Sequence, residues 1–397
     1  MREVLDELLA WWSAGEVVGA GTVVDTFRSA PQPPGATMLV GPDGTVAGSV
    51  SGGCVEGTVY DLAAAVRETR EGALHWFGVS DDDAFSVGLT CGGELAILIT
   101  AIDQATFADF DQFVDDVKAG RPVALATIIE HPDPTRIGRR LVLRPAQPHS
   151  TGGTSTGDLG SERLNRAVLD DGLGLLSAGQ DSVIEYGPEG QRLEHGCRVF
   201  VCSFAPAPRL IVFGAIDFAK SMTTAGRFLG YDVTLCDARP IFATSERFPD
   251  ADRVVVDWPH RYLAAERDAG RLDARTALTV LTHDPKFDVP LLEVALRLPE
   301  VGYVGAMGSR QAHEDRLSRL REAGVTAAEL ARLRSPIGLD LRGRTAAETA
   351  MSIGAEIVAL RWGGTGAPLS RVNGSIHQHA SADNATTRED PRHPRRR

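Results

Sequence analysis

The sequence predicts an α/β protein, in which an N-terminal mixed α+β domain is followed by a domain built on a doubly wound parallel sheet. Two observations predict this class. Short β-type runs fill the first half, and Asp43-Gly44 between two of them favours a tight hairpin turn. In the second half, short apolar runs alternate with helical stretches, which is typical of parallel strands covered by helices on both faces.

The first half is expected to open with a helix, because apolar residues recur at helical spacing between Leu5 and Trp12. Residues 147–160 are rich in Gly, Ser, Thr and Pro, and we interpret them as a loop. No internal repeat is evident. The expected strands are residues 17–27, 36–40, 46–50, 95–100, 123–130, 140–144 and 199–204, and the expected helices are residues 54–71 and 107–119.

The second half has the strand and helix order of a Rossmann-like fold. Its expected strands are residues 210–213, 233–236, 254–256, 277–281 and 301–304, and its expected helices are residues 219–229, 262–269, 290–298 and 311–323. We therefore divide the chain into an N-terminal domain (1–204), a linker with two prolines (205–209), a Rossmann-like domain (210–362) and a polar tail that we expect to be disordered (363–397).

The composition excludes several classes of function. The chain has 397 residues and a formal net charge of −12, which argues against broad binding to nucleic acid or to anionic membranes. It has no run of about 18 apolar residues and no basic, apolar leader, so we expect neither a membrane span nor a signal peptide. Five cysteines without a CxxC pair indicate neither a disulfide framework nor a structural zinc site. We expect a cytoplasmic protein.

A glycine-rich segment with a cysteine, residues 48–57, is expected to run from a strand into a helix. Gly52 and Gly53 allow a sharp turn and a close approach to a ligand, and Ser51 is placed to cap the helix. Free amides at a helix start favour an anion, and the same field favours the thiolate form of Cys54. The motif alone leaves open a purely structural turn with an inert cysteine.

A second segment repeats this pattern. In residues 88–94, Cys91 is followed by Gly92 and Gly93, immediately before an expected strand. Two cysteines in matched glycine turns suggest a shared pocket in which both thiols are candidate reactive groups. A disulfide between the two cysteines under oxidising conditions is the alternative.

The first strand–turn–helix unit of the second half partly matches a dinucleotide fingerprint. Asp237 lies 23 positions after Gly214, the spacing of the acidic residue that binds a ribose. However, Ile216 stands where a glycine would let a pyrophosphate approach, and Asp217 adds a negative charge beside it. NAD(P) binding is therefore one interpretation, and a Rossmann-like domain without a dinucleotide is the other.

Two further loops follow expected parallel strands, whose carboxyl ends face the ligand crevice in such sheets. His283 and Asp284 follow one strand, while Gly308, Ser309 and Arg310 follow the next. The second loop offers amides, a hydroxyl and a guanidinium to a phosphate. The alternatives are a loop histidine with only a structural hydrogen bond and an arginine that pairs with acidic neighbours on its own helix.

Taken together, these motifs resemble the XdhC/CoxI family, the accessory proteins of molybdenum hydroxylases such as xanthine and CO dehydrogenases. The resemblance rests on several long motifs in the same order and extends over residues 15–100 and 208–377. One departure is the first turn of the second domain, which usually reads Gly-Ala-Gly-His in the family and here reads Gly214-Ala215-Ile216-Asp217. The motifs are GSVSGGCVEG, LTCGG, LTHDPKFDVPLL, YVGAMGSRQAHEDRL and SPIGLDL.

The resemblance implies an accessory and maturation role rather than substrate turnover. Family members bind the molybdenum cofactor, support its sulfuration with a cysteine desulfurase, and insert it into an apo-molybdenum hydroxylase. It implies a cofactor site at Ser51, Gly52, Gly53, Cys54 and Cys91, where the Cys54 thiolate is a candidate molybdenum contact or sulfur carrier. A homodimer is a further expectation. The competing hypotheses are an NAD(P)-dependent oxidoreductase and a scaffold that only recruits proteins.

Overall fold

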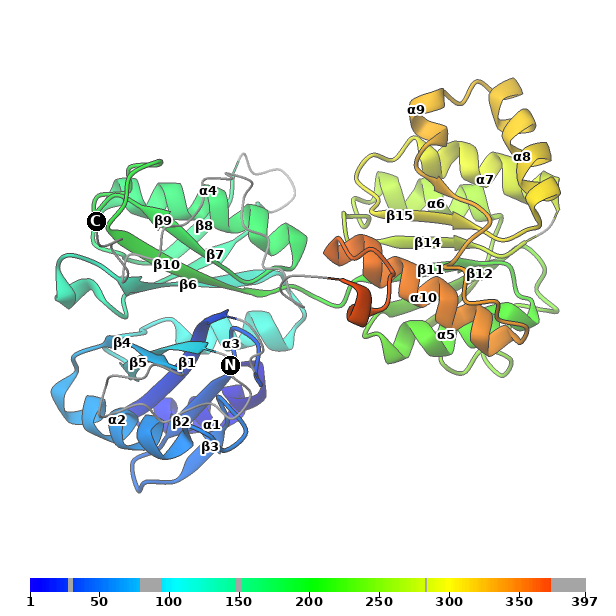
Figure 1. The fold of residues 1–397 in the computed structure, drawn as a ribbon. Helices are drawn as coiled ribbons and strands as arrows, with labels where there is room; N and C mark the ends of the chain where they lie inside the picture. The colour runs from blue at the N-terminus through cyan, green and yellow to red at the C-terminus, as the bar shows by residue number, and fades with distance from the viewer. Residues whose placement is uncertain (28–30, 79–93, 147–151, 283, 373–397) are drawn as a thin grey trace.

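A computed structural model describes residues 1–27, 31–78, 94–146, 152–282 and 284–372 of the chain. Within these residues the N-terminal half forms two five-stranded antiparallel sheets, and the C-terminal half forms one six-stranded parallel sheet (Figure 1). The predicted fold class is confirmed. The domain boundaries at residues 204 and 210 stay predictions, although strand β10 ends at Phe204 and strand β11 begins at Arg209.

The first sheet has the strand order β3-β2-β1-β5-β4, and every neighbouring pair is antiparallel. Along the chain, helix α2 lies between β3 and β4. The elements are β1 (Val18–Phe27), β2 (Thr37–Val40), β3 (Val46–Gly48), α2 (Glu56–Thr69), β4 (Ala73–Phe77) and β5 (Glu94–Ile102).

The second sheet has the strand order β8-β7-β6-β10-β9, again antiparallel throughout. Along the chain, helix α4 lies between β8 and β9. The elements are β6 (Val123–Glu130), β7 (Arg140–Arg144), β8 (Thr154–Gly157), α4 (Glu162–Ala178), β9 (Ser182–Tyr186) and β10 (Cys197–Phe204).

The two sheets are therefore two copies of one unit, in which three strands, a helix and two strands follow one another in the same spatial order. Equivalent residues repeat the same contacts. A Cβ atom at Gly48 would collide with the carbonyl oxygen of Thr37, and one at Gly157 with that of Arg140, the residues that begin β2 and β7. The expectation that the chain has no internal repeat was wrong. The two copies share their topology but not their residues, so the repeat is not visible in the sequence.

The two repeats pack face to face. Their sheets share one hydrophobic cluster, which includes Leu39 of the first sheet and Leu125 of the second. Helices α1 (Leu5–Ser13) and α3 (Phe110–Lys118) add apolar side chains to this cluster. Helix α2 covers the outer face of the first sheet and α4 covers that of the second (Figure 1).

The parallel sheet has the order β13-β12-β11-β14-β15-β16. Strands β12 and β13 therefore lie on one side of β11, and strands β14, β15 and β16 lie on its other side. In open α/β sheets the ligand crevice lies at this switch point between β11 and β14. The strands are β11 (Arg209–Phe213), β12 (Asp232–Asp237), β13 (Arg253–Val256), β14 (Ala277–Val280), β15 (Tyr303–Ala306) and β16 (Leu333–Arg334).

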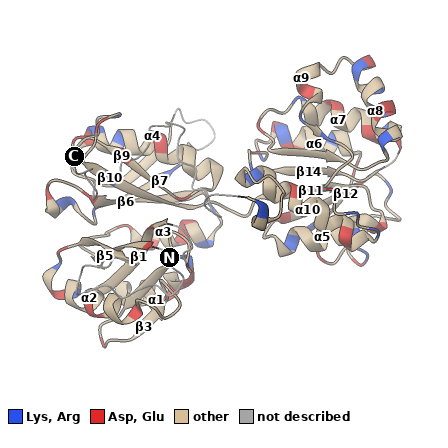
Figure 2. Cartoon of the chain, viewed as in Figure 1, with Lys and Arg blue, Asp and Glu red and all other residues tan. Residues whose placement is uncertain are grey.

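Helices cover both faces of the parallel sheet, as predicted. One apolar cluster lies between the sheet and α6, α7 and α8, and another lies between the sheet and α5 and α10. Figure 2 shows acidic and basic residues interspersed, for example along α8. The helices are α5 (Asp217–Phe228), α6 (Pro259–Asp268), α7 (Pro285–Leu296), α8 (Arg310–Glu322), α9 (Ala327–Leu330) and α10 (Ala346–Trp362).

The structure adds elements that the sequence did not predict, among them β4, β9 and α4. Part of the expected 147–160 loop forms β8, an edge strand whose Thr, Ser and Gly residues pair with β7. Within the expected tail, residues Leu369–Arg371 form a short 3-10 turn, and residues 373–397 lie outside the described part of the chain. Among the described helices, none has the length and apolar character needed to cross a membrane.

Candidate functional site

The glycine-rich cysteine segment forms the loop between β3 and α2. Gly52 and Gly53 have φ angles of 75° and 121°, the left-handed region that residues with a side chain rarely adopt. A Cβ atom at either position would meet nothing within 4 Å, so the backbone conformation rather than packing requires glycine there. The Cys54 side chain is half-buried at the end of this turn.

The carboxylate of Glu56 holds the loop together. It accepts hydrogen bonds of 2.8 Å from the Ser49 hydroxyl and from the backbone amides of Ser51 and Gly53, and a further one from the Ser51 hydroxyl. The amide of Val55 approaches it at 3.3 Å. The carboxylate therefore occupies the position that we predicted for an external anion, and sequence reasoning missed this role of Glu56.

The remaining loop amides are also engaged within the loop. The Ser51 hydroxyl oxygen accepts from the amides of Cys54 at 3.0 Å and Val55 at 3.1 Å, and the amide of Gly52 donates to the Ser49 hydroxyl. Ser51 thus caps the turn and not the helix, which begins at Glu56. In this conformation the amides of residues 51–55 are engaged within the loop and fix the backbone around Cys54, and anion binding at this helix start stays a prediction.

The hydrogen bonds to Glu56 change its acidity. Partial burial alone would raise the pKa of its carboxyl group, but the hydrogen bonds from Ser51 and Ser49 outweigh burial and lower the pKa to about 2. The carboxylate is thus charged throughout the neutral and mildly acidic range, and the loop keeps its internal anion there.

This lowered pKa gives the loop a defined pH dependence. Because the folded pKa lies below the ordinary value of 4.5, the carboxylate's stabilisation of the loop is complete above pH 4.5 and is lost as the pH falls toward 2. We expect hydrogen-exchange protection of residues 49–55, corrected for intrinsic rates, to be constant from pH 7 to 5 and to fall below that range. In the Glu56→Gln variant this acid-dependent step should be absent, and its persistence would assign the step to another group.

The predicted second cysteine turn lies outside the described residues, so Cys91, Gly92 and Gly93 are not placed beside Cys54. Two other cysteines differ from Cys54 in their surroundings. Burial raises the pKa of the Cys197 thiol to about 11, and it raises the pKa of the Cys236 thiol further. Both side chains are fully buried in hydrophobic clusters, which is typical of inert structural cysteines.

The second group of predicted site residues gathers at the carboxyl edge of the parallel sheet. Gly214 follows β11, Asp237 ends β12, and Asp284 follows β14. Asp237 is buried, and its carboxylate accepts a 2.7 Å hydrogen bond from the amide of Ala215 and a bidentate contact from the guanidinium of Arg239 at 2.8–2.9 Å. It fastens the first strand–helix turn, and its role at a ribose stays a prediction.

The start of α5 does not resemble a pyrophosphate cradle. Asp217 is exposed in its first turn, where a negative charge already complements the helix dipole. Ile216 occupies the N-cap position and makes no side-chain cap. At Gly214, with φ 105°, an added Cβ would lie 2.7 Å from a methyl carbon of Thr282, so this glycine serves close packing of two loops.

The other two predicted loops act as helix caps. Asp284 accepts a hydrogen bond from the amide of Lys286 at the start of α7, and Ser309 accepts one from the amide of Ala312 at the start of α8. Gly308 precedes Ser309 in an extended turn, and Arg310 is exposed. His283 lies outside the described residues.

Sequence reasoning missed a buried ion pair beneath these loops. The guanidinium of Arg316 lies 3.1 Å from the Asp288 carboxylate, donates to the carbonyl of Met307 at 2.8 Å, and reaches the Ser335 hydroxyl at 3.0 Å. The Thr282 hydroxyl donates to the other oxygen of Asp288. This network ties together the loops that follow β14, β15 and β16.

From this geometry we expect no saturable binding of NAD⁺ or NADP⁺. Asp217 would face the pyrophosphate, and the Asp237 carboxylate is held by Ala215 and Arg239. Calorimetric titration of each dinucleotide into the full chain measures this, with a known dehydrogenase as a positive control. A saturable heat of binding would contradict this interpretation and would support the oxidoreductase hypothesis instead.

The structure does not unite the two groups of predicted residues. Cys54 lies just before α2 in the N-terminal half, and Figure 1 shows α2 well apart from the parallel sheet. The residues at the sheet edge belong to loops of the Rossmann-like unit. Any ligand of the cysteine loop is therefore not held by Gly214, Asp237 or Ser309 in this arrangement.

Comparison with known families gives two matches that together span more than half of the chain. The model of the XdhC Rossmann domain matches residues 210–357. The model of the XdhC and CoxI family matches residues 11–78 and 117–187, one segment in each repeat of the N-terminal half.

Two curated relatives align with most of the chain. The molybdenum cofactor insertion chaperone PaoD of Escherichia coli is 26% identical over 349 residues, which cover 86% of this chain and 82% of that protein. A probable xanthine dehydrogenase subunit from Bacillus subtilis is 25% identical over 345 residues, which cover 86% of this chain and 92% of that protein.

A solved structure has the same fold. It is described as a xanthine dehydrogenase from Bacillus halodurans, and it superposes with a TM-score of 0.58 over 90% of this chain and 95% of that chain. The sequence identity is 22%, so this likeness shows the fold alone.

Proposed function

Because this chain belongs to the XdhC and CoxI family, we propose that it is a maturation factor that carries the molybdenum cofactor as cargo and supports its insertion into an apo-molybdenum hydroxylase. The names of the two curated relatives, a cofactor insertion chaperone and a probable xanthine dehydrogenase subunit, support this role. The Rossmann-like unit does not favour the oxidoreductase alternative, because Asp237 and Asp217 are arranged against a dinucleotide.

The observation that carries the proposal for the site is the position of Cys54. A loop whose amides at residues 51–55 are engaged offers its cargo a thiol on a fixed backbone, not an open phosphate cradle. A thiolate is a suitable donor to a molybdenum centre or a carrier of sulfur. In this proposal Cys54 contacts the cargo, while Ser51, Gly52, Gly53 and Glu56 position it.

The proposal extends to partners. A cysteine desulfurase would supply the sulfur for the cofactor, and the client would be a hydroxylase of the xanthine or CO dehydrogenase type. We place this exchange in the cytoplasm, where thiols stay reduced. A homodimer belongs to the same proposal, since a ligand site shared across a symmetric interface is common.

The proposal is tested by isolating the full chain anaerobically from cells that make the cofactor. We expect the protein to retain molybdopterin, measured by the fluorescence of its oxidised pterin, and to activate an apo-hydroxylase on mixing. Removing the thiol in Cys54→Ser should lower both by roughly 10- to 100-fold, the usual cost of disturbing a metal site. Ser161→Ala, at the equivalent helix start of the second repeat, is the matched control and should behave as the unchanged protein.

Two outcomes would contradict the proposal. If the unchanged protein retains no pterin under anaerobic conditions but still captures the hydroxylase or the desulfurase, the scaffold hypothesis replaces it. If Cys54→Ser retains and transfers the cofactor as well as the unchanged protein, the cargo site lies elsewhere in the chain.

A further inference from the structure

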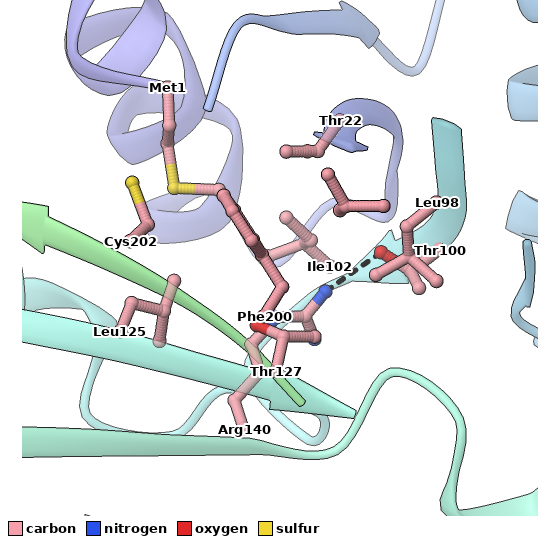
Figure 3. Close-up of a pocket in the computed structure, with 11 residues that line it drawn as sticks. Met1, Thr22, Leu98, Thr100, Ile102, Leu125, Thr127, Arg140, Phe200 and Cys202 are labelled. Atoms are coloured by element: carbon pink, nitrogen blue, oxygen red, sulfur yellow. Dashed lines mark hydrogen bonds between the residues drawn. The ribbon is translucent and has the colours of Figure 1, made fainter. Parts of the chain in front are cut away.

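A small internal cavity lies between the sheets of the two N-terminal repeats. Its volume is about 20 Å³, and its wall combines apolar side chains with polar groups from both repeats. The polar lining residues include Thr22, Thr100, Thr127 and Arg140, which Figure 3 labels. This cavity has no part in the cysteine loop or in the edge of the parallel sheet.

Arg140 brings a positive charge into this wall. It begins β7 of the second repeat, and only 7% of its surface is exposed. Its guanidinium crosses to the first repeat and donates a 2.8 Å hydrogen bond to the Thr100 hydroxyl, drawn as a dashed line in Figure 3. The same group lies 5.8 Å from the ring centre of Phe107.

This charge has no carboxylate partner among the described residues. No ion pair within the described residues includes Arg140, and the nearby carboxylate of Asp103 is paired with Arg70. Burial lowers the pKa of Arg140 to about 10, against the opposing charge of Asp103, so the group stays protonated at neutral pH. A buried charge that lacks a counter-charge is strongly unfavourable.

The second repeat differs here from the first. Arg140 pairs with Thr127 across β6 and β7, and the equivalent pair across β1 and β2 is Thr22 with Thr37. In the first repeat these two hydroxyl oxygens lie 3.1 Å apart, and the Thr37 hydroxyl also donates to the carbonyl of Gly35. The arginine therefore replaces a small neutral residue at a position where the fold itself does not need a charge.

We propose that the cavity binds one small monatomic anion, of the halide class, between the Arg140 guanidinium and the hydroxyls of Thr100 and Thr127. The ion would supply the missing counter-charge, and hydroxyl donors would complete its shell. A volume of about 20 Å³ exceeds the roughly 10–15 Å³ that one water-sized particle needs, but it is too small for the four oxygens of phosphate or sulfate. The chemistry selects a single compact anion.

The test compares thermal unfolding of the full chain in sodium chloride and in sodium gluconate at equal ionic strength. Because a ligand of the folded state raises the midpoint with its concentration, Tm should rise with chloride and should not rise with gluconate. In Arg140→Met the chloride dependence should disappear. Arg144→Met, on the same strand, is the matched control, because Arg144 already has the Asp116 carboxylate at 2.6 Å, and it should keep the dependence.

A second measurement avoids any loss of folding in the variant. Crystals of the unchanged protein grown in sodium bromide should give an anomalous scattering peak within hydrogen-bond distance of the Arg140 guanidinium. A cavity that holds only ordered water, without an anomalous peak, would overturn the proposal. An equal response of Tm to chloride in Arg140→Met and in the unchanged protein would also overturn it.

Discussion

Replacing Arg316 by methionine is expected to lower the free energy of unfolding by about 3–5 kcal/mol. The side chains of Arg316 and Asp288 are each only 6% exposed, and their charged groups lie 3.1 Å apart. The substitution would remove the Arg316 guanidinium from a buried carboxylate that also accepts a hydrogen bond from the Thr282 hydroxyl. A buried charge that loses its partner costs far more than the net value of the pair, because no solvent replaces the lost contact.

Urea unfolding of the full chain measures the effect. The matched control is Arg253→Met, which breaks the 2.7 Å pair with Asp232, whose side chains are 48% and 32% exposed. That loss should not exceed about 1 kcal/mol, because water screens an exposed pair. The double variant Arg316→Met/Asp288→Leu should recover much of the loss, since it removes both charges. An Arg316→Met variant as stable as the Arg253→Met control would contradict this account of the pair.

The Arg316–Asp288 pair also connects the stability of the fold to the loops at the carboxyl edge of the parallel sheet. Arg316 also holds the Met307 carbonyl and the Ser335 hydroxyl, which belong to the loops after β15 and β16. Loss of the guanidinium therefore frees three loops at the switch-point edge at once. The predicted residues Asp284, Gly308 and Ser309 lie on those loops or beside them, so their geometry depends on Arg316, a motif residue to which the sequence analysis assigned no role.

The parallel sheet was predictable from the sequence because its signals are local. A central strand such as β11 is a short run of Leu210, Ile211, Val212 and Phe213, all fully buried, and turns or helices bound it on both sides. Burial on both faces requires a continuous apolar run, and such runs are visible in a single sequence. The glycine turn at residues 52–53 and the helix after it were also predictable, because their signals likewise lie in neighbouring residues of the sequence.

The N-terminal duplication was not predictable in this way. Its two copies share strand order but have different residues at equivalent positions, such as Thr37 and Arg140. The partner of a buried charge is equally hidden, because Asp288 and Arg316 meet only after α7 and α8 have packed. Periodicity reports which face of an element is buried, but it does not report which polar groups meet there.

Glu56 is the residue of the candidate site whose importance the sequence motif hides, and its replacement has the second large expected effect. In Glu56→Ala the hydroxyls of Ser49 and Ser51 and the amides of Ser51 and Gly53 lose a charged acceptor. Hydrogen bonds to a charged group contribute about 1.5–3 kcal/mol, so opening of the loop should become roughly 10- to 100-fold more favourable. Cys54 would then lose its fixed position, and retention of the molybdenum cofactor should fall with it.

Hydrogen exchange of residues 49–55 measures the opening of the loop, and bound pterin measures retention in the same preparation. Glu162→Ala is the matched control, because Glu162 begins α4 as Glu56 begins α2, but its carboxylate contacts the exposed Arg166 on its own helix. It should change neither quantity. If Glu56→Ala speeds exchange but retains the cofactor fully, the cargo does not depend on the position of Cys54. If it binds more cofactor than the unchanged protein, the Glu56 carboxylate competes with the cargo for the loop amides, and the anion site predicted from the sequence exists once that carboxylate is removed.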